Sequence, residues 1–144
     1  MDATTVRRFD LVKLNSHGRW VLPRLMEAYP HLTERTAAGW LATLVNNNEF
    51  LFLETDDAVG LAQVVQAHML QTKSIVQEHF VFCRERENKD HRLAAAAMYD
   101  NFVAWTKSLG AEILVIKERS DVPDELIKAR VGRIFQRQTH FARV

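Results

Sequence analysis

The chain has 144 residues and a mass of 16.6 kDa, of which 47% are hydrophobic and 26% charged, so we expect one compact domain over residues 1–144 and exclude disordered or low-complexity material. A net charge of +1 argues against nucleic acid as a partner, and the single cysteine, Cys83, excludes an internal disulfide and a cysteine metal cage. No apolar run approaches the ~20 residues of a membrane span, so we expect a cytoplasmic protein without a membrane partner.

The first segments of the sequence predict a strand and then a helix. Residues 4–14 alternate imperfectly between apolar and polar side chains, which suits a strand, and residues 15–18 are typical of a turn. A helix is then expected, with Pro23 in its first turn and Pro30 at its end. Its apolar face has helical spacing and comprises Leu22, Leu25, Met26 and Tyr29.

A second helix and a hairpin follow. Thr33 is a suitable N-cap, and the helix is expected to end at residues 46–48, three asparagines in a row. Residues 49–54 are short, apolar and aromatic, and the Asp56–Asp57 pair supplies turn chemistry before the next apolar run. We therefore predict two strands joined by this turn.

Two longer strands are predicted next. Residues 59–70 change parity along their length, which indicates a β-bulge near Gln63. Residues 75–83 form another run rich in β-formers, with alternate side chains on opposite faces. One face would carry Glu78, Phe80 and Phe82, and the other His79, Val81 and Cys83.

The last part of the sequence predicts a loop, two helices and two strands. Residues 84–92 are almost all charged and must form an exposed loop. A long helix then ends at Gly110, a buried strand covers residues 113–116, Asp121 opens a final helix, and residues 136–144 form an edge strand. The apolar face of the long helix comprises Ala94, Met98, Phe102, Trp105 and Leu109.

The resulting order, β-α-α-β-β-β-α-β-α-β, predicts an α/β fold with a mixed, mostly antiparallel sheet and helices on both faces. In this order and spacing the sequence resembles the GNAT superfamily of N-acetyltransferases. The segments that carry the resemblance are residues 50–62, 75–82 and 102–115, with a looser match over residues 131–135 and 141–144.

The resemblance implies acetyl-CoA as co-substrate. In the family the pantetheine arm inserts between the fourth and fifth strands, and backbone amides of the loop that opens the third helix hold the pyrophosphate. Asp90 and Leu93 depart from the family's basic and glycine positions, so this pyrophosphate loop is degenerate. The cofactor-binding residues implied in this way are Phe80, Val81, Phe82, His91, Arg92, Leu93, Ala94 and Ala95. A solvated charged surface is the alternative interpretation of His91 and Arg92.

The resemblance also implies a catalytic residue, because the family often carries its general base on the fourth strand. Glu78 is the candidate in this sequence, and burial beside aromatic residues would raise the pKa of its carboxyl toward the working range. A glutamate facing solvent at a sheet edge is the alternative. No metal site is predicted, since no zinc or P-loop spacing is present.

Two hypotheses for the function follow. The first is acetyl transfer from acetyl-CoA to a small amine or a protein amino group, with the acceptor bound near the first two helices as in the family. The second is a non-catalytic protein that keeps this fold, in the concrete form of a bacteriophage virion or interaction component with protein partners or a homo-oligomeric state. Fold alone does not separate them.

Overall fold

The computed structural model describes residues 5–66, 74–111, 113–117, 121–131 and 137–138. The helices are α1 (Leu11–Ala28), α2 (Glu34–Leu44), α3 (Lys89–Ser108) and α4 (Asp124–Val131). The strands are β1 (Arg7–Arg8), β2 (Phe50–Glu54), β3 (Ala58–Gln66), β4 (Ser74–Cys83), β5 (Ile113–Lys117) and β6 (Arg137–Gln138).

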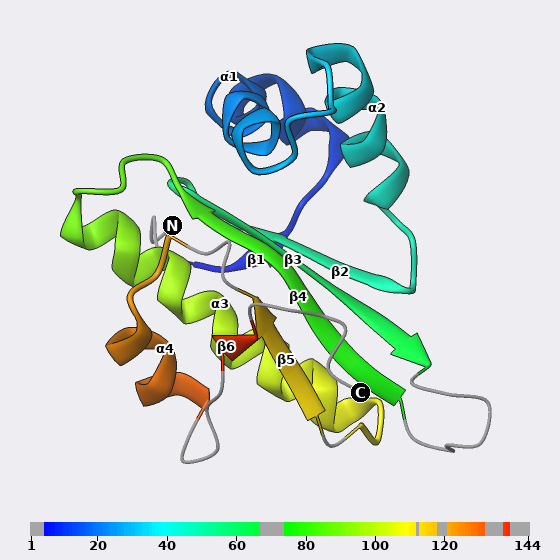
Figure 1. Cartoon of the computed structure of the whole chain (residues 1–144), viewed down its shortest axis with the longest axis vertical. Coiled ribbons are helices and arrows are strands. Elements are labelled where there is room, and N and C mark those ends of the chain that lie inside the picture. The colour runs from blue at the N-terminus through cyan, green and yellow to red at the C-terminus, as the bar shows by residue number, and fades with distance from the viewer. Residues whose placement is uncertain (1–4, 67–73, 112, 118–120, 132–136, 139–144) are drawn as a thin grey trace.

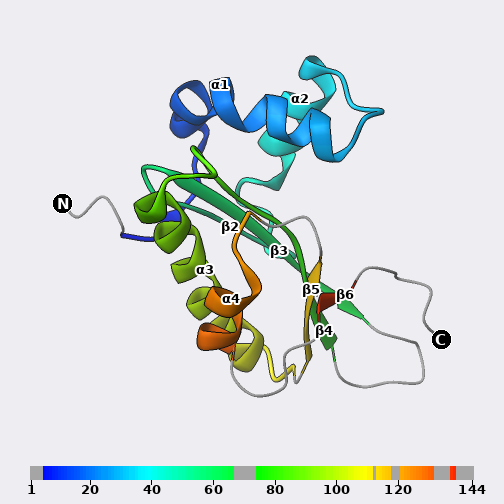
Figure 2. The ribbon, with the colours of Figure 1, turned by 60° about the vertical axis from the view of Figure 1, so that its left-hand side comes forward.

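The strands form one sheet in the order β1-β2-β3-β4-β5-β6, in which the first four are antiparallel neighbours while β4–β5 and β5–β6 pair in parallel. Helices α1 and α2 lie on one side of the sheet, and α3 and α4 lie on the other (Figures 1 and 2). The predicted α/β fold with a mixed sheet and helices on both faces is therefore confirmed.

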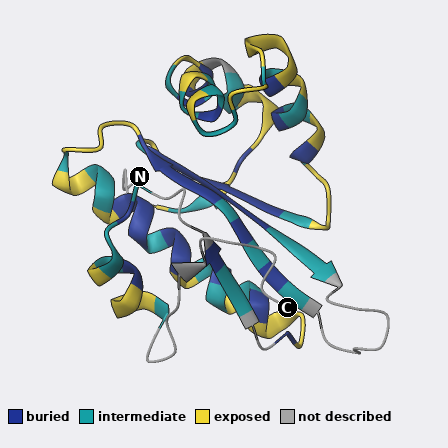
Figure 3. Cartoon of the chain, in the orientation of Figure 1, coloured by how far each residue is buried: buried dark blue, intermediate teal, exposed yellow. Residues whose placement is uncertain are grey.

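Each face of the sheet has its own apolar core, and the buried residues follow the middle strands (Figure 3). The α3–α4 side is closely packed, because a Cβ atom at Gly60 of β3 would lie only 2.7 Å from Met98 Sδ and 3.1 Å from the Phe102 ring. A glycine is required there so that α3 can approach the strand. The long helix thus lies directly against β3 and β4.

A β-bulge interrupts the pairing of β3 with β4. Leu61 pairs with Phe80 and the next residue, Ala62, pairs with Glu78, so His79 is the extra residue and lies on β4. The predicted bulge is confirmed close to Gln63, between Leu61 and Ala62, but the extra residue belongs to β4 and not to β3. The bulge changes which side chains share a face, since Glu78 now shares the α3 side with Val81 and Cys83.

The prediction for the N-terminus is wrong in its boundaries. Of residues 5–14, which the structure describes, only Arg7–Arg8 are in a strand. Helix α1 begins at Leu11 after the N-cap Asp10, so residues 15–18 and Pro23 lie inside the helix. The buried face of the helix continues through His17, whose ring is hydrogen-bonded to Glu54 of β2. That contact lets a polar side chain fill an apolar helix position, which the local sequence does not indicate.

Other predicted boundaries are confirmed. Thr33 caps α2 with a reciprocal capping box, the Asp56–Asp57 turn joins β2 to β3, and Gly110 ends α3 with a φ of 70°. The long helix begins earlier than expected, however, because Asn88 caps it and residues 89–92 are already helical. Residues 139–144 of the predicted last strand lie outside the described part of the chain.

Candidate functional site

The fourth and fifth strands separate within the sheet. They pair from Ile75 with Ile113 to Gln77 with Val115, and β4 then continues to Cys83 while the end of β5 pairs with β6. Beyond Gln77, β4 has no further pairing with the described residues of β5. This separation lies next to the His79 bulge.

The turn before α4 occupies part of that edge. The Asp121 amide donates to the Val81 carbonyl at 2.9 Å, and the Cys83 amide donates to Asp121 Oδ2 at 3.1 Å. Asp121 was expected to open the last helix, which begins instead at Asp124. Its carboxylate is occupied by β4 and by two arginines that come from other elements.

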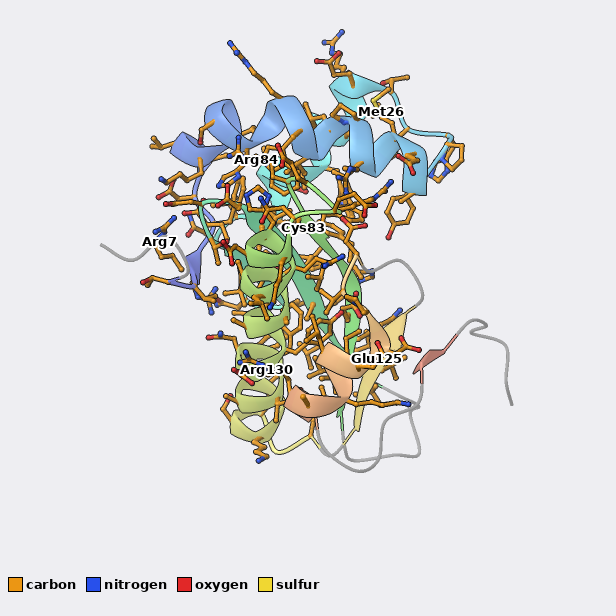
Figure 4. All side chains as sticks on the ribbon, turned by 90° about the vertical axis from the view of Figure 1, so that its left-hand side faces the viewer. Arg7, Met26, Cys83, Arg84, Glu125 and Arg130 are labelled. Atoms are coloured by element: carbon orange, nitrogen blue, oxygen red, sulfur yellow. The ribbon has the colours of Figure 1, made fainter. Side chains whose placement is uncertain are left out.

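Those arginines tie three parts of the molecule together. Arg24 of α1 lies 2.5 Å from Asp121 Oδ2, and Arg86, from the loop before α3, donates to Oδ1 at 3.0 Å. Arg86 also pairs with Glu27, and Arg24 donates to the Arg84 carbonyl. Figure 4 shows Arg84 and Cys83 between α1 and the first turn of α3. Arginines and carboxylates therefore form a network of ion pairs beside the separated strands.

The first turn of α3 is the part of the structure where the predicted pyrophosphate loop was expected. Asn88 Oδ1 accepts from the amides of Asp90 and His91, and the Asn88 carbonyl accepts from the Arg92 amide. The chain itself therefore satisfies amides that an anion would otherwise use.

The residues predicted to bind the pyrophosphate differ in their exposure and in their partners. His91 Nδ1 accepts from the Glu85 amide, and its Nε2 lies 3.5 Å from Asp57 Oδ1. Arg92 is half-buried near the Arg86 carbonyl, and Leu93 is exposed. Ala94 and Ala95 are buried in the α3 core. An anion at this helix end would meet the exposed Asp90 carboxylate as well as the half-buried His91 and Arg92.

Replacing Asn88 by Ala tests this local arrangement. We expect the free energy of unfolding to fall by about 0.5–2 kcal/mol, because two amides of α3 lose their side-chain acceptor. Urea denaturation measures the change. Asn88→Gly, which suits the N-cap position, is the matched control and is expected to cost only a few tenths of a kcal/mol. Equal losses in the two variants would contradict a capping role.

Glu78, the predicted base, is fully buried on the α3 side of the sheet. The Tyr99 hydroxyl donates to Glu78 Oε2 at 3.2 Å, and Tyr99 is also fully buried. The alternative of a solvent-facing glutamate is wrong. The expected shared face with Phe80 and Phe82 is also wrong, because the bulge at His79 lies between them.

His79 is a titratable residue at the strand separation that the sequence analysis did not assign to the site. Its Nε2 lies 2.7 Å from Gln63 Oε1, and its ring is 6.2 Å from that of Phe50. The Tyr29 hydroxyl of α1 lies 3.5 Å from the His79 carbonyl. These neighbours place the half-buried imidazole on the α1–α2 side.

The three implied pantetheine-binding residues of β4 lie in the two cores. Phe80 and Phe82 stack on each other with centroids 4.8 Å apart on the α1–α2 side. Val81 is buried on the α3 side, and its carbonyl accepts from Asp121. Their side chains stabilise the sheet, and contact with a ligand would go through the backbone edge.

A second polar cluster is buried between α1 and the edge of the sheet. Glu54 Oε2 lies 2.6 Å from His17 Nε2, and Arg7 donates to Oε1 at 3.0 Å. Trp20 donates to His17 Nδ1, so the neutral ring must donate to Glu54 through Nε2. Burial lowers the pKa of His17, against the opposing effect of Glu54. With both ring nitrogens occupied, this cluster fixes α1 on the sheet.

The described residues contain neither a membrane-spanning helix nor a cluster of metal-binding side chains. Among the helices of the described ranges, none combines the length and apolar character that crossing a bilayer requires. Within the same ranges, no cluster of three or more His, Cys, Asp or Glu side chains is arranged to hold a metal ion.

This chain is similar to known proteins in its structure but not detectably in its sequence. The sequence matches no family model, and no curated protein matches it. Among solved structures, the aminoglycoside 6'-N-acetyltransferase AAC(6')-Ig of Acinetobacter haemolyticus superposes with a TM-score of 0.61 at 12% identity, covering 97% of this chain and 98% of that one.

Two further structures are similar. An aminoglycoside acetyltransferase from an uncultured soil metagenomic sample, solved in complex with sisomicin, has a TM-score of 0.57 at 12% identity, covering 97% of this chain and 95% of that one. The BH1408 protein of Bacillus halodurans, solved as a tetramutant, has a TM-score of 0.61 at 14% identity, with coverage of 97% and 99%. The chain has the fold of the GNAT acetyltransferases.

Proposed function

We propose that the protein is an N-acetyltransferase that uses acetyl-CoA as co-substrate. The observation that carries the proposal is the separation of β4 from β5 beyond Gln77, directly beside the His79 bulge. An extended chain of amides such as pantetheine suits a strand edge, because it can replace the missing neighbour's hydrogen bonds. The fold shared with acetyltransferases supports the same activity.

Positive side chains support the binding of an anionic co-substrate. Arg84, Arg86 and Lys89 are exposed, and Arg92 is half-buried, at the loop and first turn between β4 and α3, where they alternate with the exposed residues Glu85, Glu87 and Asp90. Guanidinium groups bind phosphate oxygens through two parallel hydrogen bonds, which makes arginine well suited to a pyrophosphate. These side chains would bind the pyrophosphate in place of the backbone amides of a glycine loop, which the sequence lacks.

We assign the general base to His79 in preference to Glu78. An amine that arrives from the α1–α2 side meets the half-buried His79 ring at the strand separation, whereas Glu78 is buried against α3. During transfer the amine nitrogen bonds to the acetyl carbon, the bond from that carbon to sulfur breaks and the CoA thiolate leaves, and the His79 ring takes the proton from the nitrogen. A histidine is suited to this because its ordinary pKa lies near neutrality.

A second candidate function is a non-catalytic protein with this fold, in the form of a phage virion or interaction component. Two observations favour it: Asn88 occupies amides at the start of α3, and Asp121 occupies part of the β4 edge. Both places are where the family's co-substrate would bind. The two candidates therefore differ in whether acetyl-CoA binds at all.

Calorimetric titration with acetyl-CoA, beside CoA that lacks the acetyl group, tests the proposed function. We expect saturable binding of acetyl-CoA with a Kd in the micromolar range, equivalent to about −8 kcal/mol at 1 μM. Adenosine is the control ligand, since it lacks both the pyrophosphate and the pantetheine arm. Absence of binding at millimolar acetyl-CoA would reject acetyl transfer and favour the second candidate.

A further inference from the structure

The β4 edge that the proposed co-substrate needs is partly occupied by the protein itself. Strand alternation directs the Val81 carbonyl and the Cys83 amide to the same edge, and Asp121 bonds to both. The backbone contact of 2.9 Å brings the turn before α4 directly against β4 at this level. A pantetheine arm and Asp121 are therefore alternative partners of the same two backbone groups.

The side chain of Asp121 makes this contact strong. Its carboxylate accepts charge-assisted hydrogen bonds from Arg24 and Arg86 and is only 9% exposed. Such bonds are roughly twice as strong as neutral ones, and partial burial weakens the screening by water. Because Arg24 comes from α1 and Arg86 from the loop before α3, the contact joins three elements that surround the strand separation.

We propose that Asp121 is a latch that competes with acetyl-CoA for the β4 edge, so that release of the Arg24–Asp121–Arg86 contacts sets the affinity for the co-substrate. The inference rests on the proposed function, because it assumes that acetyl-CoA binds at this edge. Arg86 has a second role when the latch opens. Its side chain is 46% exposed, and once freed from Asp121 its guanidinium is available to a pyrophosphate at the start of α3.

Cys83 provides a direct reporter of the latch. It is the only cysteine in the sequence, is fully buried, and its amide is bound to Asp121. Burial raises the pKa of its thiol to about 11, so its reaction with a disulfide reagent is slow in the closed form. Opening of the latch would expose the strand edge at Cys83 and speed the reaction.

The decisive variant is Arg24→Gln, because electrostatics and latch release predict opposite results. The Arg24 charge lowers the pKa of the Cys83 thiol, so removing it would by itself raise that pKa and slow labelling. Loss of a charge-assisted hydrogen bond to Asp121 should instead speed labelling about 10- to 100-fold. We expect the faster labelling, together with a tighter Kd for acetyl-CoA by a similar factor.

Two further variants complete the experiment. Asp121→Ala removes the carboxylate that Arg24, Arg86 and the Cys83 amide share, and keeps the backbone bond to Val81. Because the Asp121 charge also raises the pKa of the Cys83 thiol, the informative readout of this variant is the Kd for acetyl-CoA, which is expected to tighten, with circular dichroism to verify folding. Asp100→Ala removes a carboxylate that pairs with Arg130 between α3 and α4, and is expected to change neither labelling nor affinity.

The outcomes separate the two proposals. If labelling does not accelerate in the folded Arg24→Gln protein, there is no latch. If labelling accelerates while the Kd of a measurable acetyl-CoA complex stays unchanged, Asp121 does not compete with the co-substrate, although the proposed function stands. If neither the wild type nor any variant binds acetyl-CoA at millimolar concentration, the proposed function and the inference fail together.

Discussion

Replacement of Glu54 by Ala is expected to lower the free energy of unfolding by about 3–5 kcal/mol. The carboxylate is 1% exposed and accepts hydrogen bonds from His17 and from Arg7 Nε, so its removal takes the acceptor from the buried His17 ring and from Nε, while Arg7 keeps its pair with Asp56. Urea denaturation followed by circular dichroism measures the loss. Because the cluster joins α1 to β2, the variant should also unfold less cooperatively if α1 detaches first.

Asp100→Ala is the matched control for this prediction, since it also removes a carboxylate from an arginine pair. Its partner Arg130 is 35% exposed and Asp100 is 52% exposed, so the expected loss is at most about 1 kcal/mol. A loss of that small size in Glu54→Ala would contradict the structural role of the buried cluster.

The same cluster predicts a pH dependence of stability. The pKa of His17 is lowered in the folded protein from an ordinary 6.5, so the unfolded chain binds the proton more readily. The free energy of unfolding should therefore fall as the pH drops through about 6.5, and the loss should continue down to the folded-state pKa. Denaturation midpoints across this range measure the slope, and His17→Gln, which does not titrate, should flatten it.

Replacement of His79 by Gln is expected to lower the rate of acetyl transfer by about 10²- to 10⁴-fold. Glutamine keeps a polar group opposite Gln63 but does not take up a proton at neutral pH. Affinity for acetyl-CoA should be little changed, because the β4 edge that would bind it is formed by backbone groups. Release of CoA, followed with a thiol reagent at saturating acetyl-CoA and a panel of amines, measures turnover.

Glu78→Gln is the matched control, since it changes the neighbouring residue on the opposite face of β4. We expect its turnover to stay close to that of the wild type in the folded fraction. A large loss in Glu78→Gln with none in His79→Gln would reverse the assignment. The dependence of turnover on pH adds a second readout, because the fall in rate toward low pH should disappear in His79→Gln. In the wild type the groups that face the His79 ring are Gln63 and Phe50, and the titratable Tyr29 hydroxyl lies at the His79 carbonyl.

The order and type of the secondary structure elements could be predicted from the sequence. Spacing of apolar residues identified α2, α3 and α4, and short β-branched or aromatic runs identified β2 to β5. Turn and capping residues, such as Thr33 and Gly110, fixed ends because their effect is carried by hydrogen bonds to nearby residues. These signals are local, and the sequence contains them in full.

The start of α1 could not be predicted in the same way. His17 interrupts an otherwise apolar helix face, and only its contact with Glu54, 37 residues away, makes that position buried. The face of Glu78 also depended on a partner, because the extra residue of the bulge is set by how β3 and β4 pair. Alternation along one strand does not reveal which of two paired strands carries the extra residue.

The sequence by itself therefore determined the fold class, and its resemblance to the GNAT superfamily supplied the expected position of the candidate site between the fourth and fifth strands and the third helix. Only the tertiary structure decided which groups form that site: it buried Glu78 against Tyr99, placed His79 on the α1–α2 side, and brought Asp121 to Arg24 across 97 residues. The physical reason is that periodicity reports burial along one element. The partners of a polar side chain depend on how the elements pack together, because a buried charge is stable only when a group of another element pairs with it.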